Sequence, residues 1–170
     1  MTEPAFEDLI AGWAAGKQGP KSDGTALPSH HAQCLGCGQE NPHGHQLVVR
    51  REGDLAVTAE HRFDERHVGA AGIAHGGAVA TVLDDLDGFR LYSIGDLAVT
   101  RELQVEYLRP VRLNRDYRLR ATVDARVGRG IQMSATLETP EGRVTATSRA
   151  LFVAVGVEHF KAHGNGSTSL

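Results

Sequence analysis

Residues 72–94, GIAHGGAVATVLDDLDGFRLYSI, decide the fold of this chain. From Gly76 to about Ile94 the segment is rich in alanine and aliphatic residues and contains no proline, and Gly95 follows where a helix can end. Such a helix would be about 28 Å long at about 1.5 Å per residue. It is the one long helix that the sequence predicts, and one of its faces carries Val79, Val82, Leu83, Leu86 and Arg90.

Strand patterns lie on both sides of this helix. Before it, residues 55–63 alternate between apolar and mostly polar side chains, and a shorter strand at 47–51 can pair with them across a turn. After it, four strands joined largely by tight turns are predicted at 97–108, 117–127, 131–137 and 143–155. Short turns imply antiparallel neighbours, and one helix covers such a sheet only if the sheet wraps around it. The sequence therefore predicts an α+β fold, an antiparallel sheet wrapped around one long central helix.

The chain ends are expected to lie outside this core. A short N-terminal helix is predicted from the spacing of Phe6, Leu9, Ile10 and Trp13. A polar linker follows at 17–29, and the many His, Cys, Gly and Pro residues of 30–46 predict an ordered but irregular loop. We divide the chain into an N-terminal helix, linker and entry loop, a folded domain, and a tail expected to be disordered, at 1–45, 46–156 and 157–170 respectively.

Composition excludes several classes of protein. With 18 Lys and Arg against 21 Asp and Glu, the net charge of −3 gives no support for a nucleic-acid partner. No apolar run approaches the roughly 20 residues of a membrane helix, and the N-terminus lacks the pattern of a signal peptide. Two cysteines are too few for a disulfide scaffold. By elimination, these features indicate a cytoplasmic protein.

The start of the long helix has the features of a site that stabilises negative charge. Gly76 and Gly77 let another group approach the backbone closely, and the first turn of a helix offers unpaired N–H groups with a partial positive charge. Together they could form an oxyanion hole for a carbonyl under attack, with His75 at the mouth of the helix. The alternative is a tight loop with no chemical role, because short glycine motifs also occur by chance.

Three acidic residues, Asp84, Asp85 and Asp87, lie within the otherwise apolar helix. Aspartate is a poor residue for a helix interior, so a carboxylate here suggests a function. A carboxylate facing a cavity could act as a general base on water or attack directly. Three acids within four residues cannot all point the same way, so one or two of them are expected on a solvated strip of the helix.

The run GIAHGGAVATVLDDLDG, followed by VTRELQVEYLRPV, resembles the hotdog-fold thioesterases of the phenylacetate-pathway type and their human thioesterase-superfamily relatives. The entry segment CLGCGQENPHG resembles one that is common in bacterial members. The resemblance covers roughly residues 45–155. It implies that the catalytic Asp lies nine positions after the His, which is Asp84, and that a Thr sixteen positions later, Thr100, helps to hold water. Asp85 is the substitute if the helix is drawn one position off.

The resemblance also implies a mechanism and partners. Acyl-CoA would bind between two copies of the chain in a homodimer or homotetramer. The N–H of Gly77 would hold the thioester carbonyl, with Gly76 beside it, and Asp84 of the other copy would act as base or nucleophile. His75 would orient the pocket and would not be the base. No cofactor or metal is implied.

Two assignments depend on geometry that the sequence leaves open. Alternation along 97–108 places Thr100 with the acidic face of its strand, so it reaches Asp84 only across an interface or through a β-bulge. CoA phosphates need local positive charge, for which Arg109 and Arg129 are the candidates, beside Arg112 and Arg115. The other strand arginines, Arg118, Arg120 and Arg126, are expected on a solvent face.

A zinc site is an alternative interpretation of the entry loop. Cys34 and Cys37 form a CxxC pair, and the four histidines nearby could complete a four-ligand set: His30, His31, His43 and His45. The second half of the set lacks the usual finger spacing, and the resembled family does not depend on zinc. A packed loop of thiols and turns, with no metal, is therefore the expectation.

Two other functions stay open beside thioester hydrolysis. Hotdog dehydratases and hydratases use a His paired with a carboxylate; His75 and Asp84 lie over about 13 Å apart on one helix, so His61 or His67 would have to serve. A non-catalytic acyl-CoA-binding protein would keep the pocket without needing an acid on the helix.

Overall fold

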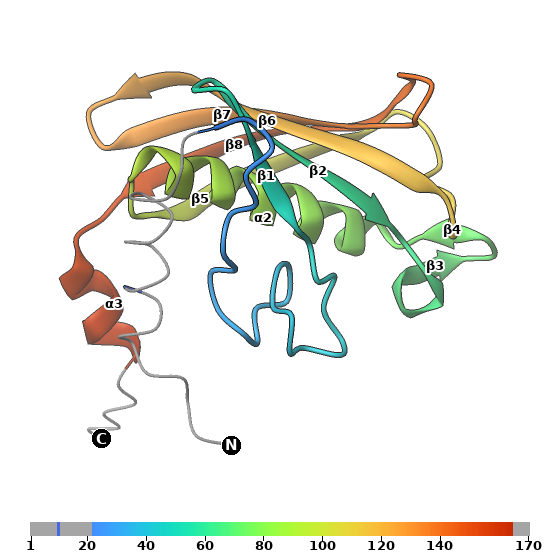
Figure 1. The fold of residues 1–170 in the computed structure, drawn as a ribbon, viewed down its shortest axis with the longest axis horizontal. Coiled ribbons are helices and arrows are strands. Elements are labelled where there is room, and N and C mark those ends of the chain that lie inside the picture. The colour runs from blue at the N-terminus through green and yellow to red at the C-terminus, as the bar shows by residue number, and fades with distance from the viewer. Residues whose placement is uncertain (1–9, 11–21, 165–170) are drawn as a thin grey trace.

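The computed structural model describes residue 10 and residues 22–164, with side chains to residue 160. A six-stranded antiparallel sheet in the order β1-β2-β6-β7-β8-β5 arches over the long helix α2, Gly76–Ile94 (Figure 1). The strands are β1 Val49–Glu52, β2 Ala56–Arg62, β5 Ala98–Tyr107, β6 Asp116–Val127, β7 Gly130–Glu138 and β8 Val144–Ala154. Helix α2 contacts all six strands, so the sheet wraps around it as predicted.

Helix α2 begins and ends where the sequence predicts. His75 is its N-cap residue, and Gly95 at its C-terminal end has φ 81°, the left-handed conformation that glycine adopts without strain. All five residues of the predicted apolar face are buried, and Val82, Leu83 and Leu86 are fully inaccessible. Burial of each aliphatic side chain contributes about 1.5–3 kcal/mol, so the packing of this face against the sheet stabilises the fold.

The bounds of the six strands also agree with those predicted from the sequence to within a few residues. Three other segments differ: the linker, the loop at 64–74 and the C-terminal tail. Within the predicted linker, Leu27 is buried and its N–H bonds the Val49 carbonyl at 2.8 Å, so this stretch lies along β1. The loop at 64–74 contains a 3-10 turn and a small two-stranded sheet: η1 Glu65–His67, β3 Val68–Ala70 and β4 Ile73–Ala74.

The tail expected to be disordered from residue 157 begins instead with a helix, α3, Val157–Gly164. Phe160 of α3 lines a pocket beside α2, which gives this segment an apolar contact that the sequence pattern does not reveal. The predicted N-terminal helix falls almost wholly on residues outside the described part of the chain. No helix among the described residues combines the length and apolar character needed to cross a membrane.

Three buried histidines pack around Phe63 where residues 44–47 approach β2. His45 Nδ1 lies 3.2 Å from His61 Nε2, and the His45 ring stacks on His67 with centroids 4.2 Å apart. Burial, with repulsion from His67, lowers the pKa of His45 to about 3 and the pKa of His61 to about 4. Arg66 lowers both pKa values further, whereas the negative charge of Asp64 raises them. His67 bonds the Asp64 N–H in a capping box, and its pKa is also lowered by burial. The cluster is therefore neutral at pH 7.

Candidate functional site

Asp84 and Thr100 meet at the side of α2. The Thr100 hydroxyl donates a hydrogen bond of 3.0 Å to Asp84 Oδ1. Thr100 reaches the helix because β5 carries a β-bulge between Thr100 and Glu102, where the pairing with β8 shifts by one residue. With unbroken alternation Thr100 would share the face of Glu102 and Glu106, so the bulge is what allows it to face Asp84.

Both residues line a pocket of about 320 Å³. Its wall comes from α2, from the start of β5, from His30 of the entry loop, and from Phe152 and Phe160, so apolar side chains and polar groups share the lining. Burial raises the pKa of Asp84, and the hydrogen bond from Thr100 partly opposes that rise. A carboxylate that is half-buried, hydrogen-bonded on one oxygen and open to a pocket has the properties of a general base or nucleophile.

The N-terminus of α2 lies at a different place on the surface. The exposed His75 side chain accepts the N–H of Gly77 at 2.9 Å, in an N-cap bond. The Tyr107 hydroxyl donates to the Gly76 carbonyl at 2.7 Å, and a Cβ on Gly76 would lie only 3.3 Å from the Tyr107 ring. Gly76 is therefore needed for this close approach, while the Gly77 N–H has an acceptor that a bound carbonyl would have to replace.

Gly77 and Asp84 do not converge within one chain. They are seven residues apart on the same helix, a rise of about 10.5 Å at about 1.5 Å per residue. A carbonyl held at Gly77 is therefore out of reach of Asp84 of the same copy. The two features can act on one thioester only if two copies of the chain bring them together.

The three acids of α2 point in three directions, and none lies on a solvated strip, contrary to expectation. Asp84 faces Thr100, while Asp85 Oδ1 lies 3.4 Å from His30 Nδ1 in the entry loop. Asp87 is fully buried, with Ser148 at 3.5 Å as its hydrogen-bond donor. Burial raises the pKa of Asp87 well above its usual range, which favours the neutral form of this core residue. The expectation failed because the entry loop covers Asp85, while β5 and β8 cover Asp84 and Asp87.

The two arginines expected to hold CoA phosphates are far apart. Arg109 follows β5 and donates to the Val144 carbonyl at 2.6 Å, at the beginning of β8. The Arg129 carbonyl accepts from Ala154, at the other end of β8. About ten residues at roughly 3.3 Å each separate these points by about 30 Å, so both arginines cannot hold one phosphate group in a single copy. Arg118, Arg120 and Arg126 are exposed, as expected.

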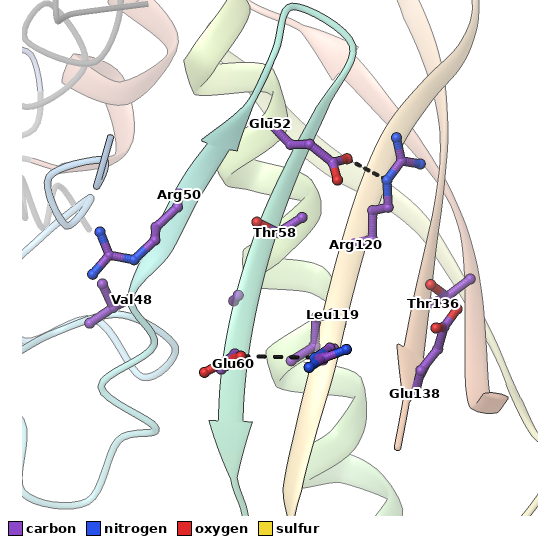
Figure 2. A pocket seen from close by; sticks show the side chains of 11 residues that line it. Val48, Arg50, Glu52, Thr58, Glu60, Leu119, Arg120, Thr136 and Glu138 are labelled. Carbon is purple, nitrogen blue, oxygen red and sulfur yellow. Dashed lines mark hydrogen bonds and ion pairs between the residues drawn. The ribbon is translucent and has the colours of Figure 1, made fainter. Parts of the chain in front are cut away.

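A second concavity, of about 690 Å³, lies on the outer face of the sheet and not at the acids of α2. Figure 2 shows its lining of paired charges, with Glu52 reaching Arg120 across β2. Arg118 and Glu60 form a second, exposed pair at 3.9 Å. Exposed ion pairs of this kind contribute little free energy, and this polar surface has none of the buried carboxylates or helix-start amides of the α2 site.

Two residues that contact α2 near the candidate site, Tyr107 and His30, were not predicted from the sequence. Tyr107 was assigned only to a strand, although an aromatic residue near the end of β5 is within reach of the helix start. His30 was considered only as one of four histidines, yet its ring stacks on Phe89 of α2 with centroids 4.1 Å apart. The sequence signal for His30 was Gly88, whose missing side chain leaves room for the His30 ring at 3.3 Å.

Comparison with known proteins gives one family and many related structures. Residues 71–146 match the family model named Thioesterase superfamily. A search of curated proteins gave no match. Protein RHA08564, described as a thioesterase superfamily protein, is 28% identical with a TM-score of 0.66; the match covers 68% of this chain and 57% of that one. The chain therefore spans little more than half of that protein's length.

Two other solved structures share the fold at lower identity. A hypothetical thioesterase from Streptococcus pneumoniae TIGR4, solved with coenzyme A, is 20% identical with a TM-score of 0.60, over 64% of this chain and 84% of that one. Further structures of that protein carry alanine in place of an aspartate and of a threonine sixteen positions later. The E. coli PaaI protein is 14% identical with a TM-score of 0.58, over 62% and 80%. The shared architecture shows that this chain has the hotdog fold, and residues 71–146 resemble the thioesterase superfamily.

Proposed function

We propose that this protein hydrolyses an acyl-CoA thioester to the free acid and CoA. The observation that carries the proposal is the Asp84 carboxylate, oriented by Thr100 at 3.0 Å and open to a pocket. Asp84 would deprotonate a water molecule or attack the thioester carbonyl itself. The sixteen-residue interval between Asp84 and Thr100 equals the interval between the two substituted residues of the Streptococcus pneumoniae protein, which supports the same pairing here.

The proposal requires at least a homodimer. The carbonyl oxygen would lie on the Gly77 N–H of one copy, in place of the His75 side chain, while Asp84 comes from the other copy. His75 is exposed, so it can turn away when the carbonyl binds. Strand β5, which carries Thr100, is at the edge of the described sheet and is available to pair with a second copy.

Relatives solved with coenzyme A or acetyl-CoA support CoA as the leaving group. The acyl group is expected to occupy the apolar part of the Asp84 pocket, towards Leu97, Phe152 and Phe160. We propose a cytoplasmic location on the basis of this substrate. Arg109 and Arg129 remain proposed ligands of the CoA phosphates. Because they are far apart in one copy, they would have to bind different phosphate groups or come from different copies of the chain.

Two alternatives are tested by the same experiment. The dehydratase or hydratase alternative is less favoured: His67 does pair with Asp64 at 3.2 Å, but both serve the capping box of η1 and neither lines the Asp84 pocket. A non-catalytic acyl-CoA-binding protein would bind the ligand without releasing thiol.

The test is release of free thiol from a panel of short, medium-chain and aryl acyl-CoA substrates, followed with a thiol reagent. Asp84→Asn keeps the shape of the side chain and removes the base, so we expect kcat to fall by about 10²-fold or more. Glu60→Gln, on the exposed outer face of the sheet, is the matched control and should keep full activity. If Asp84→Asn keeps wild-type kcat, the assignment is wrong; if neither protein hydrolyses any substrate but both bind them, the binding function replaces hydrolysis.

A further inference from the structure

The entry loop and helix α2 bring four metal-binding side chains together. His30, Cys34 and Cys37 of the loop meet Asp85 of the helix, and one ligand atom from each lies within 4.8 Å of all the others. None of the four takes part in the thioester chemistry proposed above. We propose that these residues bind a structural zinc ion.

The distances between these atoms suit tetrahedral coordination. Zinc lies about 2.0 Å from nitrogen or oxygen and about 2.3 Å from sulfur, so the ligand atoms of a tetrahedral site are about 3.3–3.8 Å apart. His30 Nδ1 is 3.4 Å from Asp85 Oδ1 and 3.6 Å from Cys37 Sγ, and Cys34 Sγ is 3.5 Å from Asp85 Oδ1. All three separations fall in that range and the other pairs lie within 4.8 Å, so binding an ion needs a shift of about 1 Å or less between any two ligand atoms.

The surroundings hold the four ligands in place. A Cβ on Gly36 would lie 2.3 Å from Asp85 Cγ, so the loop backbone rests directly on the carboxylate. The His30 ring stacks on Phe89, and Cys37 Sγ accepts the His30 N–H at 3.3 Å. Support of this kind orients metal ligands before the ion arrives.

The electrostatics of the cluster also favour a bound cation. Asp85 Oδ2 is buried and has no hydrogen-bond partner among the described residues. Two thiolates and a carboxylate would surround a bound ion, and a divalent cation would balance most of their negative charge.

Two sulfurs, one nitrogen and one carboxylate oxygen form a ligand set that zinc accepts, and four protein ligands leave no open position for a reacting water. The role that follows is structural. The ion would attach the entry loop to α2 at the residue next to Asp84, on the wall of the pocket that His30, Asp84 and Thr100 share. The competing possibility is a disulfide between Cys34 and Cys37, which would remove both thiolates.

The experiment uses the full chain, purified without a polyhistidine tag and without chelators. Elemental analysis is expected to give roughly one zinc per chain. Cobalt(II) added to zinc-stripped, reduced protein should give the charge-transfer absorption of thiolate ligands with the strong visible bands of a tetrahedral site. Cys34→Ser/Cys37→Ser should lose the metal and the thiolate absorption. His43→Ala, an exposed histidine of the same loop outside the cluster, should keep both.

Neither readout depends on activity, so failure here leaves the hydrolase proposal untouched. Asp85→Asn provides a second variant if the double serine variant does not fold; it should weaken zinc binding in competition with a chromophoric chelator while both thiols remain. A reduced wild-type protein that takes up neither zinc nor cobalt would overturn the proposal. So would purified protein without zinc whose two cysteines react with a thiol reagent only after reduction, because that result identifies a disulfide.

Discussion

Gly36→Ala tests how tightly the entry loop rests on α2. The added Cβ would lie 2.3 Å from Asp85 Cγ, 2.5 Å from its Cβ and 2.6 Å from Oδ1. Carbon atoms in contact are normally about 3.5–4.0 Å apart, so the loop must move by about 1 Å or more. Rotation of the Asp85 side chain cannot relieve the clash, because its Cβ is also too close.

Forcing extra atoms into such a contact typically costs about 1–3 kcal/mol. For a chain of this size, about 2–4 °C of Tm corresponds to 1 kcal/mol, so we expect Tm to fall by about 2–12 °C. The assay is thermal unfolding with a reductant and a chelator present, so that packing alone is measured.

Gly156→Ala is the matched control. A Cβ there meets no atom within 4 Å and the residue has no positive φ, so its Tm should stay close to that of the wild type. If Gly36→Ala has the same Tm as Gly156→Ala, the loop does not rest on Asp85 as described, and the geometry behind the proposed zinc site fails with it.

Two further predictions concern histidines. His75→Ala removes the N-cap bond to Gly77, so the free energy of unfolding should fall by about 0.5–2 kcal/mol. The kcat of this variant should stay within a few-fold of the wild-type value. A fall in kcat of about 10²-fold or more, as for loss of a general base, would contradict the capping role. Because burial lowers the pKa values of His45 and His61 to about 3 and about 4, the unfolded chain binds protons below pH 6.5 that the folded chain does not. Stability present above pH 6.5 is then lost toward pH 4, by up to about 1.4 kcal/mol per pH unit for each histidine. Denaturant unfolding at pH 7 and pH 5 should show a weaker pH dependence in His45→Asn/His61→Asn, and an unchanged dependence would refute this account.

The long helix and the sheet could be predicted from sequence because their signals are local and repeated. The absence of proline and the C-cap at Gly95 define α2, and alternation defines the strands. Helix α3 was missed because its segment is short and offers only Val157 and Phe160 at helical spacing, and because the contact of Phe160 depends on a pocket built by distant segments. The course of Leu27 along β1 was missed for a similar reason: only the folded sheet presents the edge that it follows.

Only the part of the candidate site that depends on local spacing could be predicted from the sequence. The family resemblance assigns the catalytic role to Asp84 and not to Asp85, which stays a prediction; in the structure Asp84 meets Thr100, whereas Asp85 meets the entry loop. The bulge that turns Thr100 toward Asp84 is a shift of one residue in pairing, which no residue type in β5 specifies. The close approach of Gly36 to Asp85 is likewise a tertiary contact between segments 49 positions apart, and sequence periodicity carries no information about it.

The most direct test of the account is complementation between two inactive chains. Gly77→Pro removes the proposed carbonyl donor at a position in the first helical turn where proline is tolerated, and Asp84→Asn removes the base. If each site takes Gly77 from one copy and Asp84 from the other, a mixed dimer keeps one intact site. Random mixing of equal amounts should then restore roughly one quarter of wild-type thiol release per chain. No activity in mixed oligomers, from variants that are each folded and inactive alone, would contradict a site shared between copies.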